Sequence, residues 1–474
     1  MKRYLAVVCL IAGCLGGCSE DKSAKADRAM GALGSHVTWR ARDDSLPGHP
    51  IIGLRISYSE ATDTSFSFIG ELKELRSLEI NGCFNITDDG LKFLDNLTKL
   101  EELTLGDTPV TDAGIKHLRH LRSLRKLMIV PSPTFVVTVG DAGLKEIGML
   151  EGLEELNVCN TSVTAAILKD LKRLKKLKTL ILASTPTGDE GLGDLKALQS
   201  LVTLHLSGTH VEGSGLQCVA ELKALEDLDL HNTPFTDVGM ANIGRGTGLL
   251  TIDLGGTKVT DAGLKELMPL KHLRTLALAG TRTSDAGLRN LEGLEGLRNL
   301  DLRNTRITDA GLKHLNKLAG LEELNLSQTG VTDGGLGHLA QLKDLKRLNL
   351  SETHVTDVGL EKLKEVRGLE RLDLSQTSVT DSGLGNLKAL AALQWLDLSH
   401  TRVTGAGLKV LGEIRSLQVL RLDWTPVTDA NLKDLEQLKD LKELFVFHTL
   451  LTDAGVDDFK RALPGVDVHK VHDP

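Results

Sequence analysis

The chain has few aromatic residues and no long apolar segment near its start, and both absences narrow what it can be. Only 3% of its 474 residues are aromatic, and the apolar run from Leu5 to Leu15 has eleven residues. A transmembrane helix needs ~20 such residues, so this run is too short to span a membrane. With 41% apolar and 25% charged residues, the composition is that of a folded soluble protein.

Charge and motifs exclude further classes. The formal net charge of −8 gives no electrostatic reason to expect nucleic acid. The sequence lacks a His-Glu-x-x-His zinc motif, a Gly-x-Ser-x-Gly elbow and a Walker-type phosphate loop. His205, Asp229 and His231 could meet on neighbouring strands as a weak metal site, but such residues also meet by chance in repeats. We therefore expect no enzyme, no metal, no cofactor and no small-molecule substrate.

The N-terminal segment has the features of a secretory signal. Lys2 and Arg3 precede the apolar run, and small residues follow it. Leu15-Gly16-Gly17-Cys18 resembles the lipobox of bacterial lipoproteins, with a second match ending at Cys14. We favour Cys18, because a polar stretch begins directly after it. The resemblance implies a signal peptide over residues 1–17 and a lipid on the Cys18 sulfur. The alternative is an ordinary cleaved signal.

Three cysteines remain beyond the signal, and their number is odd. Cys83, Cys159 and Cys218 lie far apart in the sequence. We therefore predict that they are unpaired and that the chain has no disulfide framework.

The rest of the chain is dominated by a 24-residue repeat. One unit begins Leu-Asp-Leu-Arg-Asn-Thr-Arg-Ile-Thr-Asp-Ala-Gly-Leu, from Leu300 to Leu312. Every 24th residue from Thr161 to Thr449 is Thr, at thirteen positions, and one insertion lies around residues 131–137. No single unit can bury its own leucines, but stacked units share a continuous core.

Two periods alternate within each unit. Leu300 and Leu302 have the period of two that indicates a strand, and the leucines from Leu312 onward recur every three residues, as in a short helix. Thr308 or Asp309 can cap this helix. Gly311 removes a side chain where neighbouring turns would crowd.

This pattern resembles the leucine-rich repeat superfamily over about residues 50 to 470. The Thr-Asp-Ala-Gly-Leu segment is similar to the ribonuclease-inhibitor-like and cysteine-containing repeat classes, and most similar to lipid-anchored bacterial proteins. The resemblance implies an α/β horseshoe with parallel strands on its concave face and helices on its convex face. The family has Asn or Cys where this chain has Thr, and we expect the Thr column to bond backbone groups of adjacent turns.

We divide the chain into a signal peptide (1–17), a tether (18–26), an N-terminal cap (27–50), repeats (51–456) and a C-terminal cap (457–474). The N-terminal cap is predicted as a helix over residues 27–33 and a strand over residues 37–41. The first repeat strand holds Leu54 and Ile56. The C-terminal cap is predicted as a closing helix and strand, which cover the raw end of the stack.

Alternation predicts which side chains face the concave groove. An acidic and amide row and a basic row are expected side by side, and they are either a solvated face or a docking surface that sets partner choice. The first row is Asp229, Asp253, Ala277, Asp301, Asn325, Asn349, Asp373 and Asp397, and the second is Lys258, Arg282, Arg306, His354 and Arg402.

The scarce aromatic residues cluster near the C-terminus. Trp395, Trp424, Phe445 and Phe447 fall in the last three strand turns, with Arg421 among them. Aromatic residues and Arg are enriched in binding hot spots, so this cluster is the best candidate contact patch, unless the C-terminal cap folds over it.

The sequence therefore predicts an exported, lipid-anchored repeat protein that binds a protein partner through its concave face. The expected location is the cell envelope, with the outer membrane favoured because Ser, not Asp, follows Cys18. The alternatives are a structural cell-envelope protein without a single ligand and a glycan-binding module.

Overall fold

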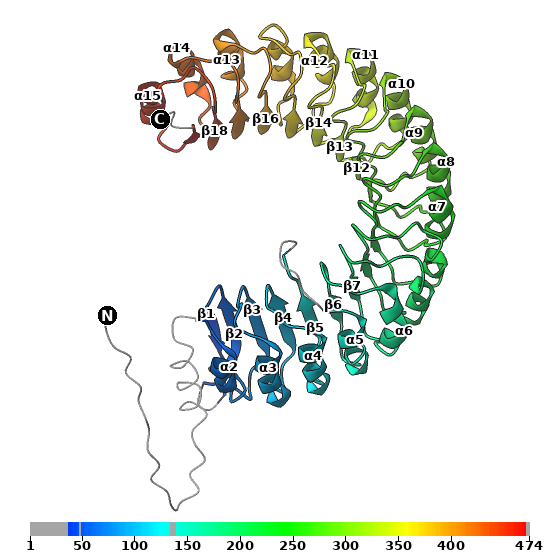
Figure 1. Ribbon diagram of the computed structural model, residues 1–474. Coiled ribbons are helices and arrows are strands. Elements are labelled where there is room, and N and C mark those ends of the chain that lie inside the picture. Colours follow the sequence, from blue (N-terminus) through cyan, green and yellow to red (C-terminus); the bar gives the residue numbers. More distant parts are fainter. Residues whose placement is uncertain (1–36, 47–48, 133–138, 471–474) are drawn as a thin grey trace, which may run out of the picture.

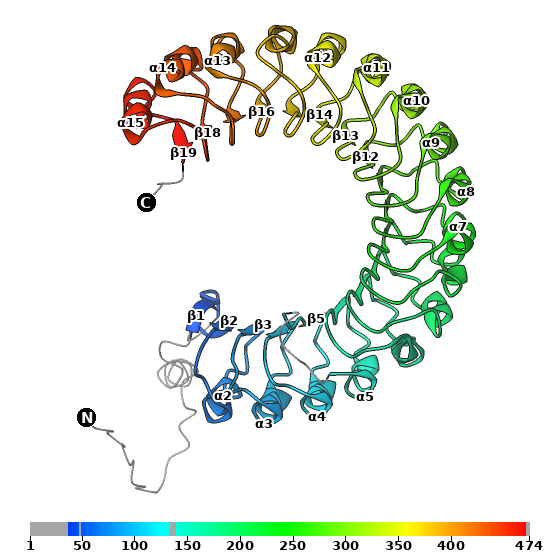
Figure 2. The ribbon, with the colours of Figure 1, turned by 45° about the horizontal axis from the view of Figure 1, so that its top comes forward.

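The computed structural model describes residues 37–46, 49–132 and 139–470, which form one open arc (Figure 1). The predicted lipobox and the helix expected over residues 27–33 lie outside the described residues. Both views show strands along the inner side of the arc and helices along its outer side (Figure 2). The predicted α/β horseshoe is thus confirmed.

The described residues contain one sheet of 19 strands in chain order. The first pair is antiparallel and the other pairs are parallel. The strands are β1 (Val37–Arg42), β2 (Ile51–Ser57), β3 (Ser77–Asn81), β4 (Glu102–Gly106), β5 (Lys126–Ile129), β6 (Glu155–Asn157), β7 (Thr179–Ile181), β8 (Thr203–His205), β9 (Asp227–Asp229), β10 (Thr251–Asp253), β11 (Thr275–Ala277), β12 (Asn299–Asp301), β13 (Glu323–Asn325), β14 (Arg347–Asn349), β15 (Arg371–Asp373), β16 (Trp395–Asp397), β17 (Val419–Arg421), β18 (Glu443–Phe445) and β19 (Asp467–His469).

Short helices return the chain to the next strand. The α-helices are α2 (Asp63–Ile69), α3 (Asp88–Leu91), α4 (Asp112–Ile115), α5 (Asp141–Leu144), α6 (Leu168–Leu171), α7 (Asp237–Ile243), α8 (Asp261–Leu264), α9 (Asp285–Leu291), α10 (Asp309–Leu312), α11 (Asp333–Leu336), α12 (Asp357–Leu363), α13 (Gly405–Leu411), α14 (Asp429–Leu432) and α15 (Asp453–Ala462). The 3₁₀ helices are η2 (Lys92–Asn96), η3 (Lys116–His120), η4 (Ile147–Met149), η5 (Ala165–Ile167), η6 (Leu192–Ala197), η7 (Leu216–Ala220), η8 (Lys265–Leu267), η9 (Lys313–Lys317), η10 (Gly337–Gln341), η11 (Leu384–Ala389) and η12 (Lys433–Gln437). No helix in the described ranges is long and apolar enough to cross a membrane.

The core is a stack of leucine layers between the sheet and the helices. In β12 the central Leu300 is buried, and it pairs in register with Leu276 on one side and Leu324 on the other. The helix leucines Leu312 and Leu315 are fully buried from the other side. Each layer covers its neighbours, so truncating one of these leucines to Ala would cost ~2–5 kcal/mol.

A left-handed turn follows each strand from β6 to β18, a feature that sequence analysis missed. Every 24th residue from Asn160 to His448 has a positive φ, between 53° and 68°. Three of these thirteen residues are glycines and the other ten bear side chains, including Asn304 and Trp424. This conformation disfavours most side chains, so tertiary packing imposes it. The turn directs the chain off the sheet and onto the side of the arc.

The Thr column follows this turn directly, and its bonding differs from our expectation. All thirteen hydroxyls donate to the carbonyl three residues earlier in their own repeat, at 2.5–2.9 Å, as Thr305 does to Leu302. They do not reach an adjacent turn. The reason is geometric, because the tight turn brings that carbonyl within reach of the short Thr side chain.

The Asp of each Thr-Asp-Ala-Gly-Leu segment also acts differently from the predicted helix cap. Thr308 caps α10 by accepting the Ala310 N–H, whereas Asp309 bonds the next repeat. Its two oxygens accept the Thr332 N–H (2.8 Å) and the Thr332 hydroxyl (2.6 Å). We call this arrangement the Asp clamp, and it recurs at eleven junctions between Asp63 and Thr452.

The glycine of the same segment makes room for this clamp. A Cβ atom on Gly335 would lie 2.7 Å from the Asp309 carboxylate, closer than real side chains approach. Gly311 stands in the same relation to Asp285. The prediction that Gly311 relieves crowding between turns is confirmed, and the crowding group is the carboxylate of the preceding repeat.

The two ends of the described arc are closed as predicted. At the start, β1 pairs with β2 and lays Trp39 across Gly53. At the far end α15 buries Phe459, and β19 adds a last parallel strand with Val468 buried. The strand expected over residues 37–41 and the closing helix and strand are therefore confirmed. The three cysteines are free, as expected.

Candidate binding groove on the concave face

Each three-residue strand presents its first and third residues to the concave face, because its central leucine is buried. The third residues form the acidic and amide row that was predicted. The first residues form a second row that sequence analysis overlooked, except for Trp395. From β12 to β18 this second row is Asn299, Glu323, Arg347, Arg371, Trp395, Val419 and Glu443. The sequence could have predicted this second row, because each of its residues stands two positions before a residue of the predicted row.

The side chains of the predicted row stabilise the backbone turn as well as facing the groove. Seven of its eight side chains, all except Ala277, accept the backbone N–H two residues later, at 2.7–3.0 Å. Such Asx turns end a strand and start the left-handed turn. In Asp373 one carboxylate oxygen accepts this bond and the other faces the groove, whereas the second oxygen of Asp301 lies 4.0 Å from the Arg303 guanidinium.

The same bond fixes the orientation of two amides. The Oδ1 atoms of Asn325 and Asn349 accept the N–H groups of Ser327 and Ser351, so each Nδ2 group turns toward the groove. A backbone N–H needs an oxygen acceptor, which leaves no ambiguity about the amide. The row therefore offers two donors, flanked by acceptors at Asp301 and Asp373.

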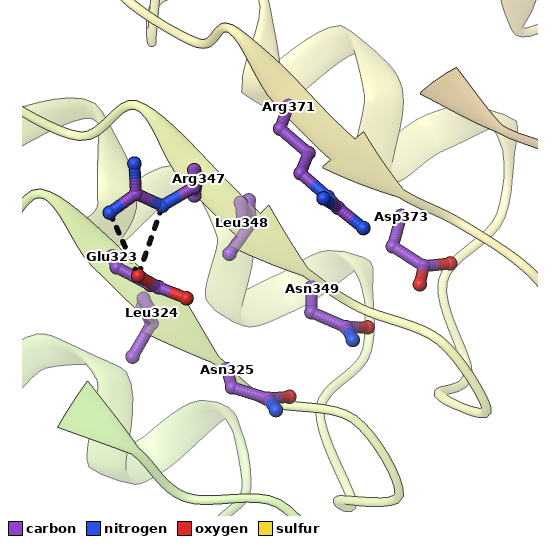
Figure 3. Close-up of a pocket in the computed structure, with 8 residues that line it drawn as sticks. All are labelled: Glu323, Leu324, Asn325, Arg347, Leu348, Asn349, Arg371 and Asp373. Carbon is purple, nitrogen blue, oxygen red and sulfur yellow. Dashed lines mark hydrogen bonds and ion pairs between the residues drawn. The ribbon is translucent and has the colours of Figure 1, made fainter. Parts of the chain in front are cut away.

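These donors line a hollow of about 270 Å³ over β13, β14 and β15 (Figure 3). On its other side, Arg347 forms two contacts with Glu323, from Nε at 3.0 Å and Nη2 at 2.9 Å. Arg371 stacks on the Trp395 ring, with its guanidinium carbon 3.8 Å from the ring centre. Arg371 is exposed and has no carboxylate within 4.0 Å among the described residues. The hollow thus holds one paired and one unpaired guanidinium beside two amide donors.

The predicted residues nearer the C-terminus are bound to one another. Arg421 lies between Asp397 (3.2 Å) and Asp423 (2.9 Å), and its guanidinium covers the Phe445 ring at 4.6 Å. Burial raises the pKa of the Asp397 carboxyl, although hydrogen bonds from Ser399 oppose the rise. Asp397 is only 8% exposed, so it offers little to a partner.

The aromatic cluster is arranged in stacks along the arc. Trp424 occupies a left-handed turn, is 54% exposed, and is sandwiched between His400 (5.3 Å) and His448 (4.0 Å). Phe445 is stacked on His469 of the last strand at 4.2 Å. The C-terminal cap thus covers one face of Phe445. The cluster divides into a groove part at Trp395 and Phe445 and a flank part at Trp424.

Phe447 follows β18, half-buried, with its N–H donated to Asp423 at 2.8 Å. Its ring lies 6.3 Å from that of Phe445.

The predicted basic row does not border the acidic row. Arg306 and Arg402 come two residues after the left-handed turns at Asn304 and His400. Each forms a bridge with the loop of the preceding repeat, so both lie on the flank of the arc, exposed. Lys258, Arg282 and His354 occupy the same slot. The expected pair of opposite stripes in the groove is therefore wrong, because the turn separates them.

The histidines of β8 and the following repeat each lie beside an aspartate. His205 Nε2 lies 3.1 Å from Asp227, and His231 Nδ1 lies 3.6 Å from Asp253. Asp229 instead accepts the His231 N–H. Among the described residues no group of three potential ligands is placed to hold a metal ion.

Comparison with known proteins agrees with this architecture. Two family models, both described as leucine-rich repeat, match residues 197–220 and 343–403. A leucine-rich repeat protein of Leptospira interrogans is 24% identical, covers 79% of this chain and 91% of its own, and has a TM-score of 0.59. An internalin of Listeria monocytogenes is 18% identical over 88% of this chain and 94% of its own, with a TM-score of 0.40. No curated protein matches the chain significantly.

At 24% identity the Leptospira interrogans structure shows the fold alone. The family models, the 24-residue period and the 19-stranded arc of the described residues all identify the same repeat. Proteins of this kind generally mediate protein–protein interactions and are typically non-enzymatic binding scaffolds. The chain thus carries leucine-rich repeats, and its described residues have the leucine-rich repeat fold.

Proposed function

We propose that this chain is an exported, lipid-anchored protein that binds a protein partner along its concave face from β12 to β18. The observation that carries the proposal is the hollow over β13 to β15. There Asn325, Asn349 and Arg371 present hydrogen-bond donors that no described residue satisfies. Asp301 and Asp373 present acceptors on either side.

A preformed groove suits binding by complementarity. Its polar side chains are already oriented by turn bonds or by stacking, so little conformational entropy is lost on association. The alternation of donors and acceptors along the arc selects the partner, which must offer carbonyl or carboxylate oxygens opposite Asn325 to Arg371. The stacked Arg371 and Trp395 are of the residue types that dominate binding hot spots.

The experiment exchanges donors for acceptors without disturbing the fold. Asn325→Asp with Asn349→Asp keeps each turn bond, because the Asp residues of neighbouring repeats make the same bond. Partners are captured in the native host by crosslinking, and the purified partner is then titrated. We expect the double variant to bind at least tenfold more weakly, through two lost hydrogen bonds of ~1 kcal/mol each.

Asp229→Asn is the matched control, since it changes the same slot four repeats away and keeps its own turn bond. Binding that is equal in wild type, the double variant and Arg371→Ala would contradict a role for the hollow. A chain that captures no saturable partner would favour the structural cell-envelope alternative.

The lipid anchor is tested separately, by intact mass and fractionation of the protein made in its own host. We expect a membrane-bound species that begins at Cys18 and carries added acyl mass, which Cys18→Ser abolishes and Cys14→Ser does not. A bacterial lipoprotein carries several acyl chains, so its anchoring is stable. A soluble species without lipid would remove the anchor and leave the groove proposal standing.

The glycan-binding alternative finds less support. Sugars stack on open aromatic faces, but His400 and His448 cover both faces of Trp424. Arg421 and His469 flank Phe445, and Arg371 covers one face of Trp395. These contacts favour a partner that approaches ring edges and charged groups.

A further inference from the structure

The total charge of the chain conceals a strongly positive segment. Residues 116–178 contain twelve Lys and Arg against six Asp and Glu, a net charge of +6. The whole chain has a net charge of −8, so the residues outside this segment have a net charge of −14. Charge separated to this degree produces a local potential that the average does not reveal.

The unneutralised part of this segment lies on the outer side of the arc, around α5, α6 and the turns beside them (Figure 1). We call it the basic patch, and its residues are all exposed, with no carboxylate within 4.0 Å among the part of the chain that the structure describes. They are Arg122, Lys145, Lys169, Lys172, Arg173 and Lys176.

Two of the six acids of the segment form ion pairs with Arg and Lys outside the patch. Glu154 pairs with Arg125 (3.3 Å) and Lys178 (2.7 Å), and Glu155 pairs with Lys126 (2.9 Å). Glu146 and Asp170, both half-buried, lie beside Lys145, Lys169, Lys172 and Arg173, and Glu101 and Glu154 lie beside Arg122 and Lys176. The positive charge is thus displaced from the concave groove to the helix side.

Four of the six basic residues, Lys145, Lys169, Lys172 and Arg173, line a shallow hollow of about 470 Å³ that also contains Met149. Met149 is 40% exposed there. The Arg122 guanidinium donates to the Met149 carbonyl at 2.6 Å, and Arg173 lies 3.2 Å from its sulfur. An exposed methionine inside a ring of lysines and arginines has the amphipathic character of a membrane-contact surface.

The residue types discriminate between anionic partners. Four of the six basic residues are lysines, which act as point charges and suit phosphates that have no fixed geometry. The residues that line the hollow include no aromatic side chain for stacking on nucleic-acid bases. A fluid layer of anionic headgroups satisfies both conditions.

We propose that the basic patch binds the anionic phospholipid headgroups of a membrane. The helix side of the arc then lies against the bilayer, and the concave groove faces away, open to its partner. This orientation rests on the lipid anchor proposed above, whereas headgroup binding does not. Cys18 lies 19 positions before Val37, so the intervening chain spans at most ~65 Å.

Vesicle flotation tests the patch without the anchor. The full chain carrying Cys14→Ser and Cys18→Ser is mixed with vesicles of phosphatidylcholine alone or with added phosphatidylglycerol. We expect the chain to float with the anionic vesicles at least tenfold more than with the neutral ones. Lys169→Glu with Lys172→Glu and Lys176→Glu should abolish this preference, since each basic residue near such a surface contributes about fivefold.

Lys313→Glu with Lys317→Glu and Lys343→Glu is the matched control. These exposed lysines occupy the slots of Lys169, Arg173 and Lys175 in later repeats. Any binding through the N-terminal segment is equal in both variants. The proposal is overturned if the two triple variants float alike, if the preference persists in 1 M salt, or if duplex DNA is retained as well as the anionic vesicles.

Discussion

Gly405 and Asn431 have exchanged the two roles that Asp and Gly hold at other junctions. In the usual arrangement Asp309 supplies the clamp carboxylate and Gly335 of the next repeat leaves room for it. Here the earlier repeat has the glycine, and a Cβ on Gly405 would overlap the Asn431 amide. The Thr428 hydroxyl donates to Asn431 Oδ1 at 2.8 Å, so the polar group comes from the opposite side.

Restoring the usual pair should make stability depend on both positions together. Gly405→Asp alone places a carboxylate against Asn431 and should lower the free energy of unfolding. Gly405→Asp with Asn431→Gly should recover the Asp clamp on Thr428 and be at least as stable as wild type. We expect a coupling energy of ~1–3 kcal/mol from urea unfolding of the two single variants and the double variant.

Additive effects of the two substitutions would contradict the exchange. Asp309→Ala provides an independent measure of one intact clamp, and it should destabilise the chain by ~1–3 kcal/mol.

The Thr column should depend on its hydroxyl. Thr329 is 6% exposed and donates to the Leu326 carbonyl at 2.6 Å. Thr329→Val keeps the shape but leaves that buried carbonyl unpaired, so we expect the free energy of unfolding to fall by ~1–2 kcal/mol. Thr329→Ser retains the hydroxyl and serves as the control. A valine variant more stable than the serine variant would show that packing, not the bond, selects Thr.

The His205–Asp227 pair predicts a pH dependence of stability. The hydrogen bond that Asp227 accepts from His205 raises the pKa of His205, against the effect of burial. The folded state therefore binds the proton more tightly than the unfolded state. The resulting stability is fully present below about pH 6.5, the ordinary His pKa, and is lost as pH rises through the raised folded value.

Thermal unfolding at pH 5.5 and pH 8 checks this sign. His205→Gln should lower the apparent melting temperature more at pH 5.5 than at pH 8. His272→Gln, at an exposed residue without an acidic partner among those described, should show no such difference. Asp229 and Asp253 add to the effect, because their charges also favour protonated His205. A larger loss at pH 8 would reverse the assignment.

The stacked aromatic residues predict little affinity for polysaccharide. Because both faces of Trp424 are covered, Trp424→Ala should leave retention on an immobilised glycan column unchanged. Trp395→Ala should instead weaken capture of the protein partner, since it removes the support of Arg371. A selective loss of glycan retention in Trp424→Ala would revive the glycan-binding alternative.

Much of this fold was predictable because the same residue pattern recurs in repeat after repeat. The spacing of Leu300 and Leu312, and the constancy of the Thr column, determined the strands, the helices and the 24-residue stacking. The groove was only half predicted. The alternation of side chains predicted Asp301 and Asp373, which stand between paired leucines. It did not predict Arg347 and Arg371, which stand before the first leucine of each pair. The basic row at Arg306 was misplaced, because a turn at Asn304 was not visible in a pattern of hydrophobic residues.

The sequence by itself determined the period, the buried leucine layers and the free cysteines, since these depend on local spacing and on burial alone. Only the tertiary structure decided where the polar side chains act. Asp309 is the first residue of its own helix but bonds Thr332 of the next repeat. Asn349 turns its amide donor toward the groove, because its oxygen accepts the Ser351 N–H. Hydrogen bonds between groups 23 residues apart require the stack itself, because only stacking brings those groups within 3 Å.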